Sequence, residues 1–230
     1  DQVSGCAFPA LQSEESSFCF LPILWNYGGS LAQIDSPAGR QAFGFLKQLA
    51  ENKALSEDNV NMTISDIAWE FANGNIAMAF LTSGYENEIR EENPDLHFAT
   101  TKLPCGENSI TISGGEVLTV TCAEHEKEAR EFVRFMEQPE QTEVYLDSMG
   151  YLAARRDLLK KQIQTDPAKK TYWSYLKQAK FREIEPYWPS LSMEVAESIN
   201  RVILGEDTQD ELEQLSERIS RIRRAKYEKE

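Results

Sequence analysis

Residues 71–85 read FANGNIAMAFLTSGY, and the interpretation of the whole chain starts from this stretch. Asn73-Gly74 permits the positive backbone angle that ends a helix. Ile76 to Leu81 is an unalternating apolar run of strand length, which predicts a strand covered on both faces. Ser83-Gly84 predicts a turn at the carboxyl end of that strand, where ligands sit in an open α/β sheet. Tyr85 follows, so its ring either contacts a bound molecule or caps the core.

The composition is that of an acidic chain with enough apolar residues for a core. Of 230 residues, 41% are hydrophobic and 10% aromatic, which suits one large or two small lobes. Lysine and arginine number 24 against 38 aspartates and glutamates, so the formal net charge is -14. Nucleic acids and anionic membranes both need a basic patch on their partner. We therefore expect neither as a partner.

The amino end gives no targeting signal. No apolar run reaches the length of a membrane helix, and Asp1 to Cys6 lacks the charged start and apolar centre of a signal peptide. We interpret Asp1 as a processed or cut start. Localisation must then be inferred by another route.

The cysteines do not follow a metal-binding pattern. Cys6, Cys19, Cys105 and Cys122 form no C-x-x-C pair, and no histidine stands near them in a zinc pattern. We therefore expect no metal and no cofactor. Four cysteines permit two disulfides in three connectivities, with Cys105 and Cys122 as one plausible pair, and buried free thiols are the alternative.

Periodicity along the chain predicts helices interleaved with a few strands. We expect no element over 1–17, because Pro9 and the cluster Ser13 to Ser17 interrupt the pattern. Three predicted helices cover 18–27, 86–92 and 125–138. Two more follow caps at Ser36, with Pro37 at the first helical position, and at Ser65. The remaining helices begin at Pro139, Pro167, Ser192 and Thr208. Strands are predicted over 110–112 and 116–122, on either side of Gly114-Gly115. This is an α/β pattern weighted to helix.

The last predicted helix carries an apolar stripe with two interpretations. Leu212, Leu215, Ile219 and Ile222 stand at spacings of three and four residues. Such a stripe is typical of a coiled-coil seam, which would make the chain a protein-interaction domain. It is also typical of a helix that packs on its own domain, which the lack of sustained heptads favours.

A search for catalytic motifs leaves one carboxylate of interest. The chain has no G-x-S-x-G, P-loop, G-x-G-x-x-G or H-E-x-x-H motif and only two histidines, His97 and His125. Most acidic residues fall on charged helix faces or in loops, as solvated residues do. Glu116 differs, because it follows Gly114-Gly115 at the start of a predicted strand. An acidic pair that includes Glu116 would suit a carbohydrate-active enzyme.

Aromatic residues stand at the ends of several predicted elements. Flat rings cover the C–H faces of sugars, while carboxylates, arginine and backbone groups bind the hydroxyls. The set suggests carbohydrate binding without turnover, and packing in the core or at its rim is the alternative for each member. Its members are Phe18, Trp25, Tyr85, Tyr151, Tyr187 and Trp188.

The order of these motifs resembles the family 1 extracellular solute-binding proteins of ABC importers, the group that includes maltose-binding protein. The resemblance runs from about Phe18 to Arg156, with a looser continuation to Gly205. The residues that carry it are Leu24-Trp25-Asn26-Tyr27-Gly28-Gly29, the helix after Ser36, Phe71 to Met78 with Gly84-Tyr85, Leu103-Pro104, Gly114 to Leu118, Glu128 to Phe132, and Gly150 to Arg155.

Members of this family have two lobes with a sugar or similar solute held between them. The resemblance implies an α/β, helix-rich, type II periplasmic-binding-protein lobe with part of a second lobe. It also implies a receptor rather than an enzyme, which passes mono- or oligosaccharide to an ABC permease and is a monomer at full length. Its location would be extracytoplasmic, in the periplasm or lipid-anchored outside the membrane.

The resemblance also implies ligand-binding positions. Tyr85 resembles the family's sugar-stacking aromatic, and the segments around Phe18 to Trp25 and around Trp188 resemble cleft-lining stretches. Gly114-Gly115-Glu116 lies where the family chain crosses between lobes. Arg155 follows an alanine where the family usually has a proline-containing turn. The implied ligand-binding residues are Phe18, Trp25, Tyr85, Gly114, Gly115, Glu116, Arg155 and Trp188.

Family chains are nearly twice as long as this one, so the resemblance implies a carboxy-terminal fragment. Residues 1–112 and 152–230 would form the carboxy-terminal lobe. Residues 113–151 would belong to the amino-terminal lobe, whose remainder is absent. We therefore predict that the segments 116–122 and 125–138 have an apolar face that this chain does not cover.

Overall fold

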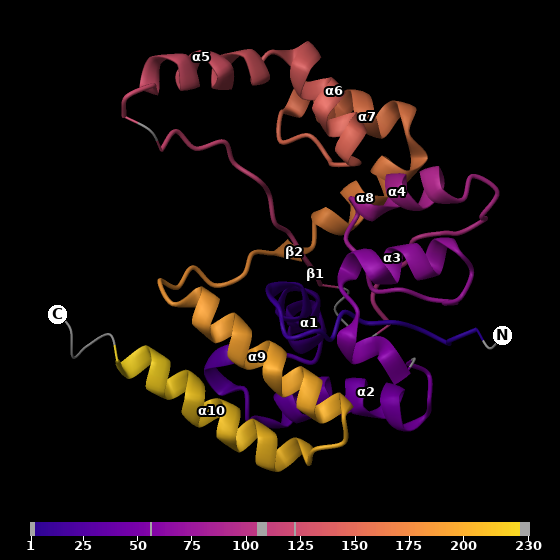
Figure 1. Ribbon diagram of the computed structural model, residues 1–230, viewed down its shortest axis with the longest axis vertical. Coiled ribbons are helices and arrows are strands. Elements are labelled where there is room, and N and C mark those ends of the chain that lie inside the picture. The colour runs from indigo at the N-terminus through magenta and orange to yellow at the C-terminus, as the bar shows by residue number, and fades with distance from the viewer. Residues whose placement is uncertain (1–2, 56, 105–109, 122, 226–230) are drawn as a thin grey trace.

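Helices dominate the fold, and a pair of short strands joins two distant parts of the chain (Figure 1). The structure is a computed structural model that describes residues 3–55, 57–104, 110–121 and 123–225. Its helices are α1 (Glu14–Asn26), α2 (Pro37–Glu51), α3 (Ile64–Ala72), α4 (Tyr85–Glu92), α5 (Glu126–Met136), α6 (Pro139–Met149), α7 (Arg156–Thr165), α8 (Pro167–Leu176), α9 (Trp188–Ile203) and α10 (Thr208–Arg224). The 3-10 helices η1 (Leu31–Gln33) and η2 (Glu57–Asn61) and the strands β1 (Thr111–Ile112) and β2 (Ala179–Lys180) complete the regular elements of these residues.

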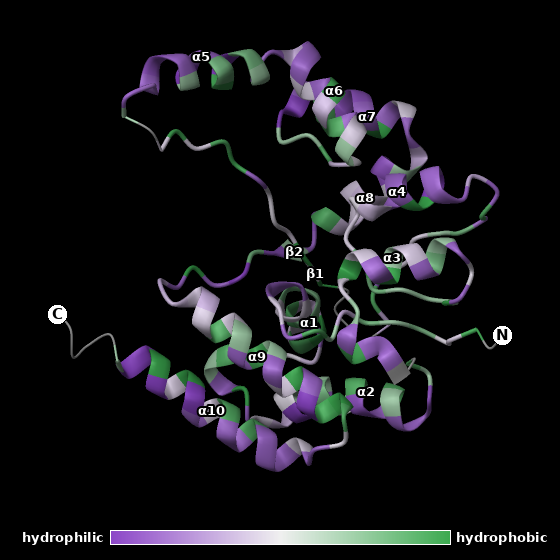
Figure 2. Cartoon of the chain, viewed as in Figure 1, coloured by the Kyte–Doolittle hydropathy of each residue, from purple (hydrophilic) through white to green (hydrophobic). Residues whose placement is uncertain are grey.

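The apolar helix α1 forms the centre of the hydrophobic core. Its side chains Phe20, Ile23 and Leu24 are fully buried. The ring of Phe20 lies 4.5 Å from that of Phe43 on α2. A helix that is apolar on most sides needs cover from several directions. Helices α2 and α9 pack on α1, which Figure 2 shows as a largely hydrophobic helix in the middle of the molecule.

Helix α1 begins earlier than the sequence predicted. It starts at Glu14 rather than Phe18, so Pro22 lies inside the helix instead of in its first turn. Ser13 is the N-cap, and Glu14 and Glu15 occupy the first turn, where the helix dipole favours negative charge. The prediction that the cluster from Ser13 interrupts all structure was therefore wrong.

The apolar run 76–81 is extended chain rather than a strand buried on both faces. It forms isolated parallel bridges, Ser4 with Ile76 and Ala7 with Ala79. Ile76 is buried, but Met78 is 63% exposed. Among the described residues, the amino-terminal segment pairs with one edge of the run, and side chains at 77 and 78 are exposed whereas those at 79–81 are partly buried. The prediction of a doubly covered strand was therefore wrong.

The predicted strand 116–122 is also irregular. Residues 116–121 form neither helix nor strand, and Cys122 lies outside the described residues. Val117 is 86% exposed and Leu118 is 57% exposed. A strand needs a partner for its backbone groups, and the described residues offer none here. The apolar residues of this segment consequently face open space.

Strands β1 and β2 tie the point where the chain leaves the main body to the point where it returns. They pair in parallel, Thr111 with Ala179 and Ile112 with Lys180. The side chain of Asn26, at the end of α1, holds the residue before β1. Its Nδ2 donates to the Ile110 carbonyl at 2.7 Å, and its Oδ1 accepts from the Ile110 amide at 2.8 Å. The core helix therefore fixes the position of both strands.

The segment between the two strands carries the helix α5, which has little cover. Figure 1 shows α5 away from the main body, joined to it by a long irregular stretch and by α6. None of the residues of α5 is buried. Phe132 is 55% exposed and Phe135 is 46% exposed. The predicted uncovered apolar face is therefore present on this helix.

Several other helices start at different residues than predicted. Thr63, not Ser65, caps α3, in a capping box with Asp66. Helix α9 starts at Trp188 rather than near Ser192, because Pro189 fits the first turn of a helix. Asp207 caps α10. Helix α7 had no counterpart in the sequence prediction, whereas the cap at Ser36 and the glycine stop at Gly150 are confirmed.

The apolar stripe of α10 is buried in its own domain. Leu212, Leu215 and Ile219 are at most 3% exposed and belong to the core that α1, α2 and α9 share. The stripe is therefore not available as a coiled-coil seam. This finding overturns the alternative in which the last helix makes the chain an interaction domain.

A buried carboxylate joins α10 to α9. Glu211 is 4% exposed, and its Oε1 accepts from Ser198 Oγ at 2.6 Å and from Arg218 Nη2 at 2.6 Å. Burial raises the pKa of Glu211, but the hydrogen bonds from Ser198 and Arg218 and the charges of Arg218 and Arg201 outweigh it. The pKa of Glu211 is therefore lower than in an unfolded chain.

We predict that Glu211→Gln lowers the free energy of unfolding at pH 7 by about 2 kcal/mol, because it removes the buried one of the two carboxylates, Glu211 and Glu194, that pair with the Arg218 guanidinium. The depressed pKa stabilises the fold above the unfolded pKa of about 4.3, and this stabilisation is lost as the pH falls through the folded value. The unfolding free energy of the variant should therefore fall less steeply between pH 5 and pH 3 than that of the parent (roughly the carboxylate range). Urea unfolding at several pH values measures both effects. The exposed Glu217→Gln is the control, and equal curves for both variants would contradict the prediction.

Candidate functional site

Several of the predicted ligand residues meet near the point where the chain leaves the main body. Phe18 on α1 lies beside Gly114, where an added Cβ would come 3.3 Å from the Phe18 ring. Gly84 lies beside Tyr151, because a Cβ there would come 2.8 Å from the Tyr151 ring. Residues from α1, from the turn before α4 and from both ends of the segment 113–151 are thus brought together.

Glu116 is held by two tyrosines from the far end of that segment. The phenol of Tyr145 donates to Oε2 at 3.0 Å, and the phenol of Tyr151 donates to Oε1 at 3.2 Å. We call Glu116, Tyr145 and Tyr151 the tyrosine–glutamate cluster. Burial raises the pKa of Tyr151, and the negative charge of Glu116 raises it further. The hydrogen bond from Tyr145 to Glu116 raises the pKa of Tyr145 in the same way.

Tyr85 is the first residue of α4 rather than a turn residue after a strand. Its phenol oxygen lies 3.0 Å from Ser65 Oγ on α3, and its half-buried ring packs against the buried cluster of Ala68, Ala72 and Ile89. Burial raises the pKa of Tyr85, and the charges of Glu15 and Glu88 add to this. The ring therefore both packs on the core and keeps a partly open side.

Gly114 and Gly115 differ in their surroundings. A Cβ on Gly114 would lie against Phe18, whereas a Cβ on Gly115 would meet nothing within 4 Å. Neither has the positive φ that requires glycine. Close approach thus explains Gly114 only, and nothing in the structure explains Gly115.

Trp25 and Trp188 lie in the core. Trp25 is 9% exposed, with the Lys180 ammonium 5.9 Å from its ring centroid. Trp188 is 7% exposed, and its indole nitrogen donates to Glu14 at 2.8 Å. Both rings thus have their faces largely covered by protein. Their predicted contact with ligand remains a prediction.

Arg155 lies apart from the tyrosine–glutamate cluster. Its guanidinium donates to Asp157 at 2.7 Å and to the Glu137 carbonyl at 3.1 Å. The hydrogen bond to Asp157 raises the pKa of Arg155, and the negative charge of Asp157 raises it further. Burial lowers this pKa by less than the hydrogen bond raises it. These contacts tie the start of α7 to the end of α5. A structural role accounts for them.

A second polar cluster was missed by the sequence analysis. The carboxylate of Glu14 accepts hydrogen bonds from the Trp188 indole, from the Ser192 hydroxyl and from the Arg182 guanidinium. The guanidinium also lies 5.3 Å from the centroid of the Trp188 ring. We call these four residues the Glu14 cluster. Phe18 stands one helical turn after Glu14, so the cluster adjoins the contact of Phe18 with Gly114. The sequence predicted that this helix starts at Phe18. A predicted start at Glu14 would have placed Glu14 and Phe18 on the same face of α1.

The two described cysteines are free thiols. Cys6 is buried, and Cys19 stands next to Phe18 on α1. Burial raises the pKa of Cys19 to about 12, and the charge of Glu15 contributes to the shift. The Cys19 thiol is therefore protonated at neutral pH and is a poor nucleophile. The predicted pair Cys105 and Cys122 lies outside the described residues.

Metal-binding groups do not gather within the described ranges. No set of three or more histidine, cysteine, aspartate or glutamate side chains is arranged there to hold an ion. The site is instead made of aromatic rings and carboxylates that are already hydrogen-bonded. Such a site can bind a neutral polar molecule by stacking and hydrogen bonding.

Comparison with known proteins places the chain in a family. A family model described as bacterial extracellular solute-binding protein matches residues 2–171. The chain belongs to this family. The family consists of solute-binding receptors, in agreement with the resemblance that the sequence motifs indicated.

Three similar proteins are distant in sequence and longer than this chain. A Brucella abortus (strain 2308) protein described as a binding protein is 19% identical over 206 residues, which cover 85% of this chain and 50% of the relative. The maltose-bound MalE3 of T. maritima has a TM-score of 0.80 at 16% identity. The matched region covers 95% of this chain and 60% of the MalE3 chain. A solute-binding protein of an ABC transporter from Thermotoga lettingae, bound with alpha-D-tagatose, has a TM-score of 0.75 at 16% identity, with coverages of 96% and 59%. The solute-binding-protein fold is thereby confirmed, and the chain spans about half to three fifths of these relatives.

Within the described ranges, no helix combines the length and the apolar character that crossing a membrane requires.

We predict that Glu116→Gln lowers the phenol pKa of both Tyr145 and Tyr151, because the variant removes the negative charge that opposes phenolate formation. NMR titration of the chain with labelled tyrosine rings measures these values. Glu131→Gln on the exposed side of α5 is the control and should leave both values unchanged. A parent-like titration of Tyr151 in Glu116→Gln would show that the cluster does not form.

Proposed function

We propose that this chain is the carboxy-terminal portion of a two-lobed extracytoplasmic receptor that binds a carbohydrate and delivers it to an ABC permease. The observation that carries the proposal is the convergence of Phe18, Tyr85 and the tyrosine–glutamate cluster at the crossing beside β1. These residues come from separate parts of the chain. A receptor that closes around its solute needs a site of this kind, in which both lobes contribute side chains.

Carbohydrate is the solute class that suits this chemistry. Sugars present C–H faces to rings and hydroxyls to carboxylates. Phe18, Tyr85 and Tyr151 are partly exposed rings, and Glu116 has lone pairs beyond those that the two phenols occupy. Maltose-bound and tagatose-bound proteins of the same fold support this choice. Phe18, Tyr85, Gly114 and Glu116 are the positions that we propose for ligand contact.

We further propose that residues 113–151 belong to the amino-terminal lobe and that residues 1–112 and 152–230 form the carboxy-terminal lobe. The uncovered apolar face of α5, with Phe132 and Phe135 exposed, supports this division. The partial coverage of the relatives supports it as well. The missing portion of the first lobe would then cover α5, and the complete receptor would be monomeric.

The proposed receptor performs no chemistry on its solute. Both oxygens of Glu116 accept hydrogen bonds from phenols, as expected of a carboxylate that binds hydroxyl groups. The receptor family supports the same conclusion. Release of reducing ends from an oligosaccharide would favour the alternative of a carbohydrate-active enzyme that uses Glu116.

We predict that calorimetry of this chain, joined to the remainder of its two-lobed receptor, detects binding of at least one member of a panel of mono- and oligosaccharides. Tyr85→Ala should weaken that binding roughly tenfold or more, because it removes the stacking surface. Tyr85→Phe keeps the ring and loses only the contact with Ser65, so its affinity should stay close to that of the parent.

Tyr175→Ala, on α8, is the control for loss of a half-buried tyrosine elsewhere. Absence of heat with every sugar would contradict the proposed solute class. Equal affinities of Tyr85→Ala and the parent would contradict the role of Tyr85.

A further inference from the structure

The carboxyl end of α6 is held by a side chain of α4. Asn87 Nδ2 donates to the Asp147 carbonyl at 2.7 Å and lies 3.5 Å from the Ser148 carbonyl. The last carbonyls of a helix have no partner within the helix, so an amide from another element can satisfy them. This contact joins residues 60 positions apart in the chain.

A lysine of α8 binds the carbonyl of the residue that ends α6. The buried ammonium of Lys169 donates to the carbonyl of Gly150, the left-handed residue that ends α6. A cation at a helix carboxyl end is favoured by the helix dipole. Side chains of two other helices therefore contact the carbonyls of Asp147, Ser148 and Gly150.

Two glycines allow this close approach. A Cβ on Gly150 would lie 3.2 Å from the Gly84 carbonyl oxygen and 3.3 Å from the Asn87 side chain. Gly150 also has a φ of 71°, which favours glycine. The turn before α4 and the turn after α6 thus pass each other at backbone distance.

Helix α4 also holds α8. The buried carboxylate of Glu86 accepts a hydrogen bond from the Tyr172 phenol and two from Arg90, at 3.0 and 2.7 Å. The Tyr172 oxygen lies 3.1 Å from Thr100 Oγ1 as well. Because Glu86 is only 8% exposed, these bonds are sheltered from water and the carboxylate needs them.

We propose that Glu86, Asn87, Lys169 and Tyr172 form a latch that positions the tyrosine–glutamate cluster against Tyr85. These four residues are not among the positions that we propose for ligand contact. Glu86 follows Tyr85 directly, and the held end of α6 leads directly into Tyr151. The latch therefore fixes the two sides of the proposed site relative to each other. Its role in affinity rests on the proposed function, whereas its role in geometry does not.

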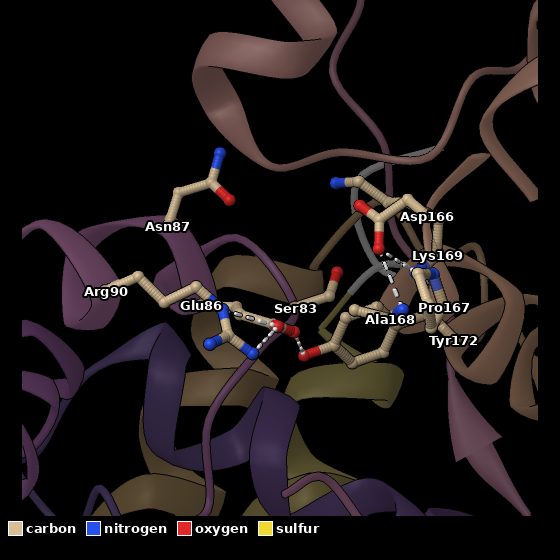
Figure 3. A pocket seen from close by; sticks show the side chains of 9 residues that line it. All are labelled: Ser83, Glu86, Asn87, Arg90, Asp166, Pro167, Ala168, Lys169 and Tyr172. Atoms are coloured by element: carbon tan, nitrogen blue, oxygen red, sulfur yellow. Dashed lines mark hydrogen bonds and ion pairs between the residues drawn. The ribbon is translucent and has the colours of Figure 1, made fainter. Parts of the chain in front are cut away.

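A cavity of about 280 Å³ lies beside these contacts (Figure 3). Figure 3 shows the Glu86 carboxylate joined to the Tyr172 hydroxyl by a hydrogen bond, with Asp166 above Ala168. Each charged side chain that lines the cavity already has a partner: Arg90 binds Glu86, Lys169 binds Gly150, and Asp166 caps α8 through the Ala168 amide at 2.8 Å. The cavity is therefore space within the seam between α4 and α8, where the latch residues have room to rearrange.

The first test uses the 230-residue chain and the variants Asn87→Ala and Tyr172→Phe. Hydrogen exchange in α6 should become roughly tenfold faster in each. Asn87→Ala removes the donor to the Asp147 carbonyl, and Tyr172→Phe removes the bond between α4 and α8, whose side chains hold the end of α6. The phenol pKa of Tyr151 should also fall, because a displaced α6 separates Tyr151 from Glu116. A purely local loss of stability would not change that titration.

Matched controls separate the latch from ordinary helix capping. Asn52→Ala removes an amide that donates to the Gln48 carbonyl at 2.8 Å at the end of α2, and Tyr175→Phe removes a phenol of α8 outside the latch. Neither control should alter exchange in α6 or the Tyr151 titration. Parent-like exchange and titration in both Asn87→Ala and Tyr172→Phe would overturn the latch.

The second test measures the affinity of the two-lobed receptor for the best sugar of the panel. Asn87→Ala and Tyr172→Phe should each weaken binding at least fivefold, by roughly one kcal/mol of coupling. Parent-like affinity together with faster exchange would overturn the role of the latch in binding. A parent receptor that binds no sugar overturns the proposed solute class and the affinity role together, and the exchange and titration results then decide the geometric role alone.

Discussion

The parallel pairing of β1 with β2 is the constraint on which the rest of the structure depends. It joins Thr111 to Ala179 and so fixes both the departure and the return of the segment between them. Asn26 extends this constraint into the core, because its amide binds both backbone groups of Ile110 at the end of the fully buried helix α1. Gly114 and Glu116, which follow β1 directly, are positioned from this junction.

The junction explains why the site and the uncovered helix occur in one segment. Near the junction, Gly114 meets Phe18, and Glu116 meets Tyr151. Farther out, α5 exposes apolar side chains that no described part of this chain covers. Exposed apolar surface of this kind marks an interaction site in a soluble protein. In the division that we propose, a second lobe that covers α5 would also close over the site, and one partner would then account for both features.

The sequence predicted those parts of the fold whose signals are local. The stripe of α5, the proline start of α6 and its glycine stop are read from neighbouring residues, and the structure has them. Cover is not local, so the apolar run 76–81 could not reveal that only one edge would be paired. The burial of Trp25 and Trp188 was not predictable for the same reason. An aromatic residue at the end of an element lies in the core or lines a cleft, depending on which other elements pack on it. The Glu14 cluster and the latch depend on contacts between residues far apart in the chain, which spacing alone does not show.

The measurement that tests the account most directly is hydrogen exchange of the amides of α5, residues 126–136, in two proteins. One is this 230-residue chain, and the other is the same chain joined to the remainder of its two-lobed receptor. The account predicts weak protection of α5 in the shorter protein and exchange slowed by roughly a hundredfold or more in the longer one, with α1 protected in both. Equal protection of α5 in the two proteins would contradict the claim that a second lobe covers this helix.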